Sequence, residues 1–189
     1  MLRCYSAPMA KRYPVPKRVL LTDARNDAVL DRAIAMLPKG SALVFRHYHL
    51  APADRVARRN QVSRICRLRG VHLVQAGDGY GRAGQLCPSA PLRLATAHSL
   101  REIGDAVRAG ADAVLLSPVF PTRSHPRGRA LGPVRFLLMA RQSPLPVIAL
   151  GGMTAGRARR LPVHGWAAID GLSPLPRQFQ KIRWNPKDS

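Results

Sequence analysis

The sequence predicts an α/β protein that folds as a (β/α)8 TIM barrel, with a degenerate region around its third and fourth strands. Short apolar runs alternate with longer helix-compatible stretches, which is typical of a parallel sheet with crossover helices. No GxGxxG follows the first apolar run, where a doubly wound dinucleotide-binding fold would carry it. Many of the runs also end on polar residues, which would line one mouth of a barrel: Asp23, Arg46, Gln75, Thr96, His98, Ser117 and Asp170.

Seven strands are expected from the short runs, which are rich in β-branched and other apolar residues. They cover residues 19–22, 42–45, 71–74, 92–96, 113–117, 146–150 and 166–170.

Five longer stretches between these runs are expected to be helices, at 28–37, 51–69, 99–109, 133–142 and 154–161. Pro52 falls in the first turn of its helix, where a missing N–H costs little. Ser99 with Glu102 predicts a capping box. Thr154 is the expected N-cap of the last helix.

The stretch between the third and fourth expected runs is too short for a regular barrel unit. Residues 76–91 read AGDGYGRAGQLCPSAP, whereas a βαβ unit occupies about 30 residues. A further strand, if present around Gln85 to Cys87, leaves room for a loop in place of at least one helix.

The chain is organised as one domain with two basic ends. Residues 1–17 form a basic arm, 18–175 the barrel and 176–189 a basic tail. No apolar run approaches the roughly 20 residues of a membrane span, so no membrane contact is expected. Three cysteines without CxxC spacing indicate reduced thiols in a cytoplasmic protein, and no metal site follows from them.

The net charge of +21 predicts an affinity for anions in general. Aromatic residues are only 5% and do not alternate with the basic clusters, which disfavours a platform for single-stranded nucleic acid. Solvated arginine faces are the simpler interpretation, while binding of nucleic acid and formation of a homo-oligomer stay open.

Several stretches carry a resemblance to a known family. Residues 95–125 read ATAHSLREIGDAVRAGADAVLLSPVFPTRSH, 147–154 read VIALGGMT and 165–172 read GWAAIDGL. They resemble the thiamine phosphate synthase/TenI family, as do, less specifically, VLLTD (19–23) and LVFRHY (43–48). The resemblance implies a (β/α)8 barrel that acts in thiamine biosynthesis. One branch couples hydroxymethylpyrimidine diphosphate to thiazole phosphate with Mg²⁺, and the other tautomerises a carboxylated thiazole phosphate with a histidine.

Glycines after the last two strands indicate a phosphate site, because they let backbone N–H groups approach anionic oxygens. The resemblance places the thiazole phosphate at Gly151, Gly152, Ile169 and Asp170. An ordinary tight turn at Gly151-Gly152 is the alternative. At position 170 the family usually has serine, and an aspartate there repels phosphate unless Arg or Lys neutralises it.

The resemblance also implies a pyrophosphate and substrate site. Its residues are Arg46, Thr96, Thr122, Ser124 and His125, with His125 where the synthases carry lysine. The family's metal-binding Asn-Asp pair falls on Gln75-Ala76, with Asp78 displaced, and its second aspartate has no counterpart. No metal ligand is therefore assigned, and Mg²⁺ is expected only if the coupling reaction is retained.

His98 is the candidate catalytic residue, since it corresponds to the histidine of the family's S/T-x-H element. Histidine can remove and return a proton near neutral pH. Three hypotheses stay open: a metal-dependent coupling enzyme, a His98-dependent tautomerase, and a non-catalytic barrel that binds a phosphorylated or nucleic-acid partner.

Overall fold

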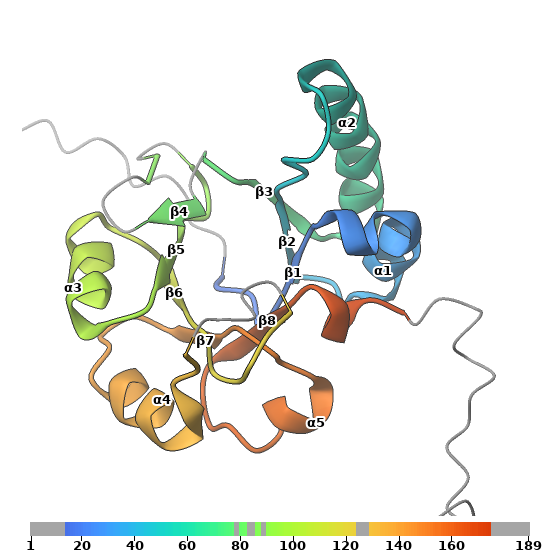
Figure 1. Cartoon of the computed structure of the whole chain (residues 1–189). Helices are drawn as coiled ribbons and strands as arrows, with labels where there is room; N and C mark the ends of the chain where they lie inside the picture. Colours follow the sequence, from blue (N-terminus) through green and yellow to red (C-terminus); the bar gives the residue numbers. More distant parts are fainter. Residues whose placement is uncertain (1–13, 78–79, 83–85, 88–89, 124–128, 175–189) are drawn as a thin grey trace, which may run out of the picture.

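The computed structural model describes residues 14–77, 80–82, 86–87, 90–123 and 129–174. Their eight strands form one parallel sheet that curls into a nearly closed ring, in the order β3-β2-β1-β8-β7-β6-β5-β4 (Figure 1). The strands are β1 (Arg18–Leu21), β2 (Ala42–Phe45), β3 (His72–Gln75), β4 (Tyr80–Arg82), β5 (Leu94–Ala97), β6 (Ala113–Leu116), β7 (Val147–Ala149) and β8 (Gly165–Ala168). The expected TIM-barrel class is confirmed.

Helices surround the ring on its outside (Figure 1). They are η1 (Ala24–Val29), α1 (Leu30–Met36), α2 (Pro52–Arg69), α3 (Leu100–Arg108), α4 (Gly132–Arg141), α5 (Ala155–Ala158) and η2 (Asp170–Leu172). Within the described residues, no helix is long and apolar enough to cross a membrane.

The local sequence explains most helix ends. Ser99 accepts a hydrogen bond from the Glu102 N–H at 3.2 Å, and Thr154 accepts one from the Arg157 N–H at 3.3 Å, as an N-cap should. The Glu102 carboxylate reaches the N–H of His98 at 3.1 Å, one residue before the cap. Thus Glu102, whose N–H bonds to the cap of α3, also holds the chain at the candidate catalytic histidine.

Two helix expectations are wrong in their bounds. The first helical stretch starts earlier, as the 3-10 helix η1 capped by Asp23, before α1 takes over. The last one ends at Ala158 instead of residue 161. Leu161 is buried and Pro162 follows it, so the chain turns inward where a longer helix would have continued.

Side chains alternate between the barrel interior and the helix layer. The interior cluster draws only on the strands and their flanking residues: Val19, Leu21, Ala42, Val44, Val74, Ala76, Leu92, Leu94, Ala113, Leu115, Ile148, Ala167 and Ile169. Two outer clusters pack under the helices, one beneath α1 and α2 and one beneath α3 and α4. Apolar burial on both sides fixes the register of each strand.

The ring is interrupted between β3 and β4, which confirms the degenerate region. Between these two strands, the described residues form one isolated parallel β-bridge, which joins Ala76 to Tyr80. The fourth strand lies at Tyr80–Arg82, earlier than the expected position around Gln85 to Cys87. Its parallel pairing with β5 holds it there, with the Thr96 hydroxyl donating to the Gly81 carbonyl at 3.2 Å. Only four residues separate Gln75 from Tyr80, so no helix fits between these strands.

Candidate functional site

The carboxyl ends of the strands meet at one mouth, and the loop after β7 is shaped by glycine. Gly151 and Gly152 have φ angles of 96° and 60°, a region that side chains rarely adopt. A Cβ on Gly151 would lie 2.7 Å from Pro118 Cα, and one on Gly152 would lie 2.5 Å from the Pro121 oxygen. The loop after β7 therefore packs directly against the loop after β6.

The N–H groups of this loop are available to a ligand. Among the described residues, the N–H groups of Gly151 and Gly152 donate to no carbonyl or side chain. The loops after β6 and β8, in contrast, both form backbone hydrogen bonds. Gly171 lies so close that a Cβ there would meet the Met153 oxygen at 2.1 Å. The two glycine-bearing loops thus lie side by side, as an anion site built from both requires.

Asp170 is paired with an arginine that the sequence did not point to. The Arg25 guanidinium lies 3.5 Å from the Asp170 carboxylate and 3.0 Å from that of Asp23. Burial opposes ionisation of Asp23, but hydrogen bonds from Arg25 hold the pKa of this carboxyl below its usual value. Ile169, the other expected phosphate residue after β8, is buried. Arg25 therefore reduces the repulsion expected at Asp170, although it is shared with Asp23.

His98 is held by the backbone at the end of β6. Its Nδ1 lies 2.8 Å from the Ser117 carbonyl oxygen and 3.3 Å from the Ser117 hydroxyl. A carbonyl can only accept, so Nδ1 carries the proton and Nε2 of the neutral ring keeps its lone pair. The His98 side chain is exposed, and its Nε2 bonds to no residue that the structure describes. This arrangement leaves a base at the mouth.

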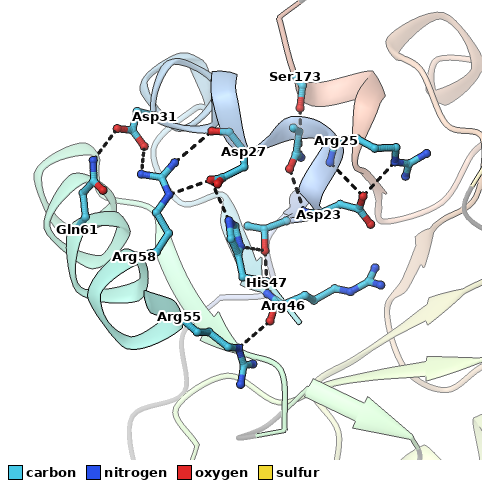
Figure 2. Close-up of polar contacts among 12 residues, drawn as sticks. Asp23, Arg25, Asp27, Asp31, Arg46, His47, Arg55, Arg58, Gln61 and Ser173 are labelled. Atoms are coloured by element: carbon cyan, nitrogen blue, oxygen red, sulfur yellow. Dashed lines mark hydrogen bonds and ion pairs between the residues drawn. The ribbon is translucent and has the colours of Figure 1, made fainter. Parts of the chain in front are cut away.

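Arg46 is fixed by its main chain at the end of β2. Its N–H donates to the Thr22 hydroxyl at 2.8 Å, and its carbonyl accepts from Arg55 Nε at 2.9 Å. Figure 2 shows the Arg46 side chain extending from this anchor to the side where Asp23 and Arg25 lie. Its charge contributes to the low pKa of Asp23. The guanidinium also lies over the Tyr48 ring, 5.9 Å from its centroid. A fixed backbone and a guanidinium held near the mouth suit an anion contact.

The remaining expected contacts are only partly described. Thr96 is half-buried, and its hydroxyl donates to the Gly81 carbonyl, so it helps to hold β4 against β5. Thr122 is half-buried in the loop after β6. Ser124 and His125 lie outside the described residues, as does Asp78.

The described residues do not fit the family's Mg²⁺ site. Gln75 at the end of β3 has an amide and buried Ala76 has a methyl group, so neither supplies a carboxylate on that side of the mouth. The mouth carboxylates of the described part, Asp23 and Asp170, sit after β1 and β8 and are both paired with Arg25. Mg²⁺ is usually held by one or two carboxylates together with water and substrate phosphates, and a carboxylate paired with a guanidinium is a poor ligand for it.

A polar cluster behind Arg46 was not expected from the sequence. Buried His47 contacts Thr22 and Asp27, while Arg58 joins Asp27 to Asp31 (Figure 2). These partners come from η1, α1, α2 and the segments that follow β1 and β2, so only the fold brings them together. The one sequence signal was a histidine two residues after an apolar strand.

Comparison with known proteins agrees with the fold and with the family that the sequence resembles. A family model described as thiamine monophosphate synthase (TMP-TENI) matches residues 56–172. A putative thiamine-phosphate synthase 2 of Aquifex aeolicus (strain VF5) is 36% identical over 41% of this chain and 42% of its own length. A thiamine-phosphate synthase of Salinibacter ruber (strain DSM 13855 / M31) is 33% identical over 54% of this chain and 47% of its own length. The chain thus spans about half the length of these curated relatives.

A solved structure supports the architecture over more of the chain. Thiamine phosphate pyrophosphorylase from Pyrococcus furiosus superposes with a TM-score of 0.64 at 24% identity. The match covers 82% of this chain and 85% of the other. At this identity the likeness concerns the fold alone.

Proposed function

This chain belongs to the thiamine monophosphate synthase (TMP-TENI) family, and we propose that its mouth binds a phosphorylated thiazole and that His98 catalyses a tautomerisation of that ring. The observation that carries the proposal is the 2.8 Å contact between His98 Nδ1 and the Ser117 carbonyl. Because that contact fixes the proton on Nδ1, Nε2 can accept a proton from a substrate carbon and return it elsewhere.

Phosphate binding is assigned to the glycine-bearing loops after β7 and β8. The free N–H groups of Gly151 and Gly152 are the donors, and they need no side chain. Arg25 supports binding by offsetting the charge of Asp170, and Arg157 braces the loop through its bond to the Gly152 carbonyl. Holding the phosphate there would keep the ring in place while its proton moves.

Tautomerisation suits this mouth better than coupling does. Coupling expels pyrophosphate, whose departing charge needs a metal with fixed carboxylate ligands. The carboxylates at the described part of the mouth are engaged with Arg25. A proton transfer needs no such metal, and one base with a free ring nitrogen is enough for it.

The test is an assay of both reactions on the purified chain. We expect aromatisation of carboxylated thiazole phosphate in the presence of EDTA, and little Mg²⁺-dependent formation of thiamine phosphate. Efficient coupling, strictly dependent on Mg²⁺, would replace this proposal with the synthase hypothesis. Neither turnover, together with strongly salt-dependent binding of nucleic acid, would favour the non-catalytic hypothesis.

A further inference from the structure

Asp27, His47 and His49 bring their ligating atoms within 4.8 Å of one another, beside the mouth and apart from the phosphate loops. We propose that these three side chains form a binding site for a transition-metal ion such as Zn²⁺. The proposal does not depend on the function assigned to His98.

The backbone places the three residues on two adjoining segments. Asp27 belongs to η1, whose start is fixed by the Asp23 cap. His47 and His49 follow β2, and the φ of 38° at His47 turns the chain so that both rings lie on the same side. Their ring centroids are 5.1 Å apart with an interplanar angle of 36°. The two histidines, which are two residues apart in sequence, therefore face one space that an ion could fill.

The burial of the three side chains suits a metal site that is open on one side. His47 is buried and Asp27 is half-buried, so these two ligands are held within the protein. His49 is exposed, which gives an ion access and leaves positions for water.

Surrounding residues hold the ligands in place. Thr22 Oγ1 lies 2.7 Å from His47 Nδ1. Because a hydroxyl can donate or accept, this contact is kept when a metal replaces the proton on Nε2. Arg58 Nε donates to Asp27 Oδ1 at 2.8 Å (Figure 2). Phe45 stacks on His47, with ring centroids 4.5 Å apart. Such outer contacts orient histidine and carboxylate ligands in metal proteins.

The distances and ligand types select the ion. His47 Nε2 and Asp27 Oδ1 are 2.9 Å apart, so a small opening of this hydrogen bond admits an ion that both ligands touch. Two imidazoles and one carboxylate suit Zn²⁺, Co²⁺ or Ni²⁺, whereas Mg²⁺ prefers oxygen ligands. Arg58 opposes a cation, so we expect weaker binding than at a zinc site made of four cysteines.

The experiment is a titration of the tag-free full chain with Co²⁺, followed by its visible absorption bands and by competition with Zn²⁺. We expect saturable binding at one ion per chain, displacement by Zn²⁺ and no competition from Mg²⁺. His49→Ala should abolish the saturable band, because it removes an exposed ligand and no hydrogen bond that holds the fold. Asp27→Asn, checked for folding by circular dichroism, should weaken binding at least about tenfold.

Two matched variants control for other histidines. His164→Ala removes a histidine that bonds to the Val15 carbonyl, and His98→Ala removes the one at the mouth. Both should keep the Co²⁺ band. Absence of a saturable band in the wild type, or a band that survives in His49→Ala, would overturn the proposal. A band lost in His98→Ala and kept in His49→Ala would place the ion at the mouth and overturn it as well.

Discussion

At the scale of single residues, the proposed chemistry depends on which ring nitrogen of His98 carries the proton. The Ser117 carbonyl decides this, because it accepts from Nδ1 at 2.8 Å and cannot donate. The Glu102 carboxylate holds the His98 N–H at 3.1 Å, so both the backbone and the ring are restrained. A residue restrained in this way can act as a base without first reorienting.

His98→Ala should lower the aromatisation rate by about 10² to 10⁴, the usual contribution of a positioned acid–base group. Phosphate binding should change little, because the proposed donors are the backbone N–H groups of Gly151 and Gly152, which His98 does not hold. Steady-state kinetics together with calorimetric titration with inorganic phosphate separate the two effects. His164→Ala is the matched control and should keep the wild-type rate. Equal losses in both variants would point to a general loss of structure.

Acid should destabilise the protein through His47. Burial lowers the pKa of this histidine, so the unfolded chain takes up its proton at a higher pH than the native state does. Stability is therefore unaffected well above the ordinary value of 6.5 and decreases as the pH falls below it towards the lowered pKa. Thermal unfolding of the wild type and of His47→Gln, between about pH 8 and about pH 5, measures how stability changes across the ordinary histidine range. The variant should be less stable at pH 8 and lose less on acidification, whereas parallel curves would exclude His47 as the cause.

Sequence reasoning found some of these residues and missed others for a physical reason. His98 stands in a local motif after a strand, and Gly151-Gly152 follows another, so a linear pattern identifies both. Arg25 and Arg58 act by reaching residues on other elements, Asp170 and Asp27. Such pairs depend on how strands and helices are placed in space, which short-range spacing does not contain.

At the scale of elements, the loop after β7 needs glycine at position 151. Alanine there would have to adopt a φ of 96° and place its Cβ 2.7 Å from Pro118. We expect Gly151→Ala to lower the free energy of unfolding by at least about 1–3 kcal/mol and to weaken phosphate binding, since the loop must shift. Urea unfolding and phosphate titration are the measurements.

Gly156→Ala is the matched control for this change. Gly156 lies in α5, where the nearest atom to a new Cβ is Thr154 Oγ1 at 4.0 Å. Alanine should be neutral or stabilise the protein by up to about 1 kcal/mol, because it favours helix more than glycine does. If Gly151→Ala behaves in the same way as Gly156→Ala, the loop is not the tightly packed turn described above.

The β3–β4 seam shows what element lengths can and cannot predict. A stretch too short for a βαβ unit correctly indicated a missing helix, because chain length is a hard limit. The position of β4 was missed, since Tyr80–Arg82 reads YGR and has no apolar pattern. It is a strand because β5 offers an open edge for pairing and Tyr80 packs against the interior cluster. Burial raises the pKa of Tyr80 to about 12, so its phenol stays neutral at this edge.

At the scale of the whole molecule, charge determines which ions the mouth can hold. The chain carries +21, and the mouth carboxylates in the described part of the chain are paired with Arg25. Anions should therefore bind there directly, without a bridging divalent ion.

Mg²⁺ alone should not bind the mouth of the apo-protein tightly. The mouth carboxylates in the described part of the chain are paired with Arg25. Gln75 and buried Ala76 stand where the resemblance places the first pair of metal ligands. Calorimetric titration in a phosphate-free buffer is the measurement, with inorganic phosphate as the positive control. A dissociation constant well below about 1 mM, accompanied by a raised melting temperature, would contradict this account of the mouth.

We propose that one histidine at the mouth moves a proton on a phosphorylated thiazole without a metal. The most direct measurement is the aromatisation rate of carboxylated thiazole phosphate in EDTA, compared between wild type and His98→Gln. Glutamine keeps a polar side chain of similar reach but cannot exchange a proton near neutral pH. We predict turnover by the wild type and a rate lower by at least about 10² in the variant. Equal rates in the two proteins, or no turnover by the wild type until Mg²⁺ is restored, would contradict the claim.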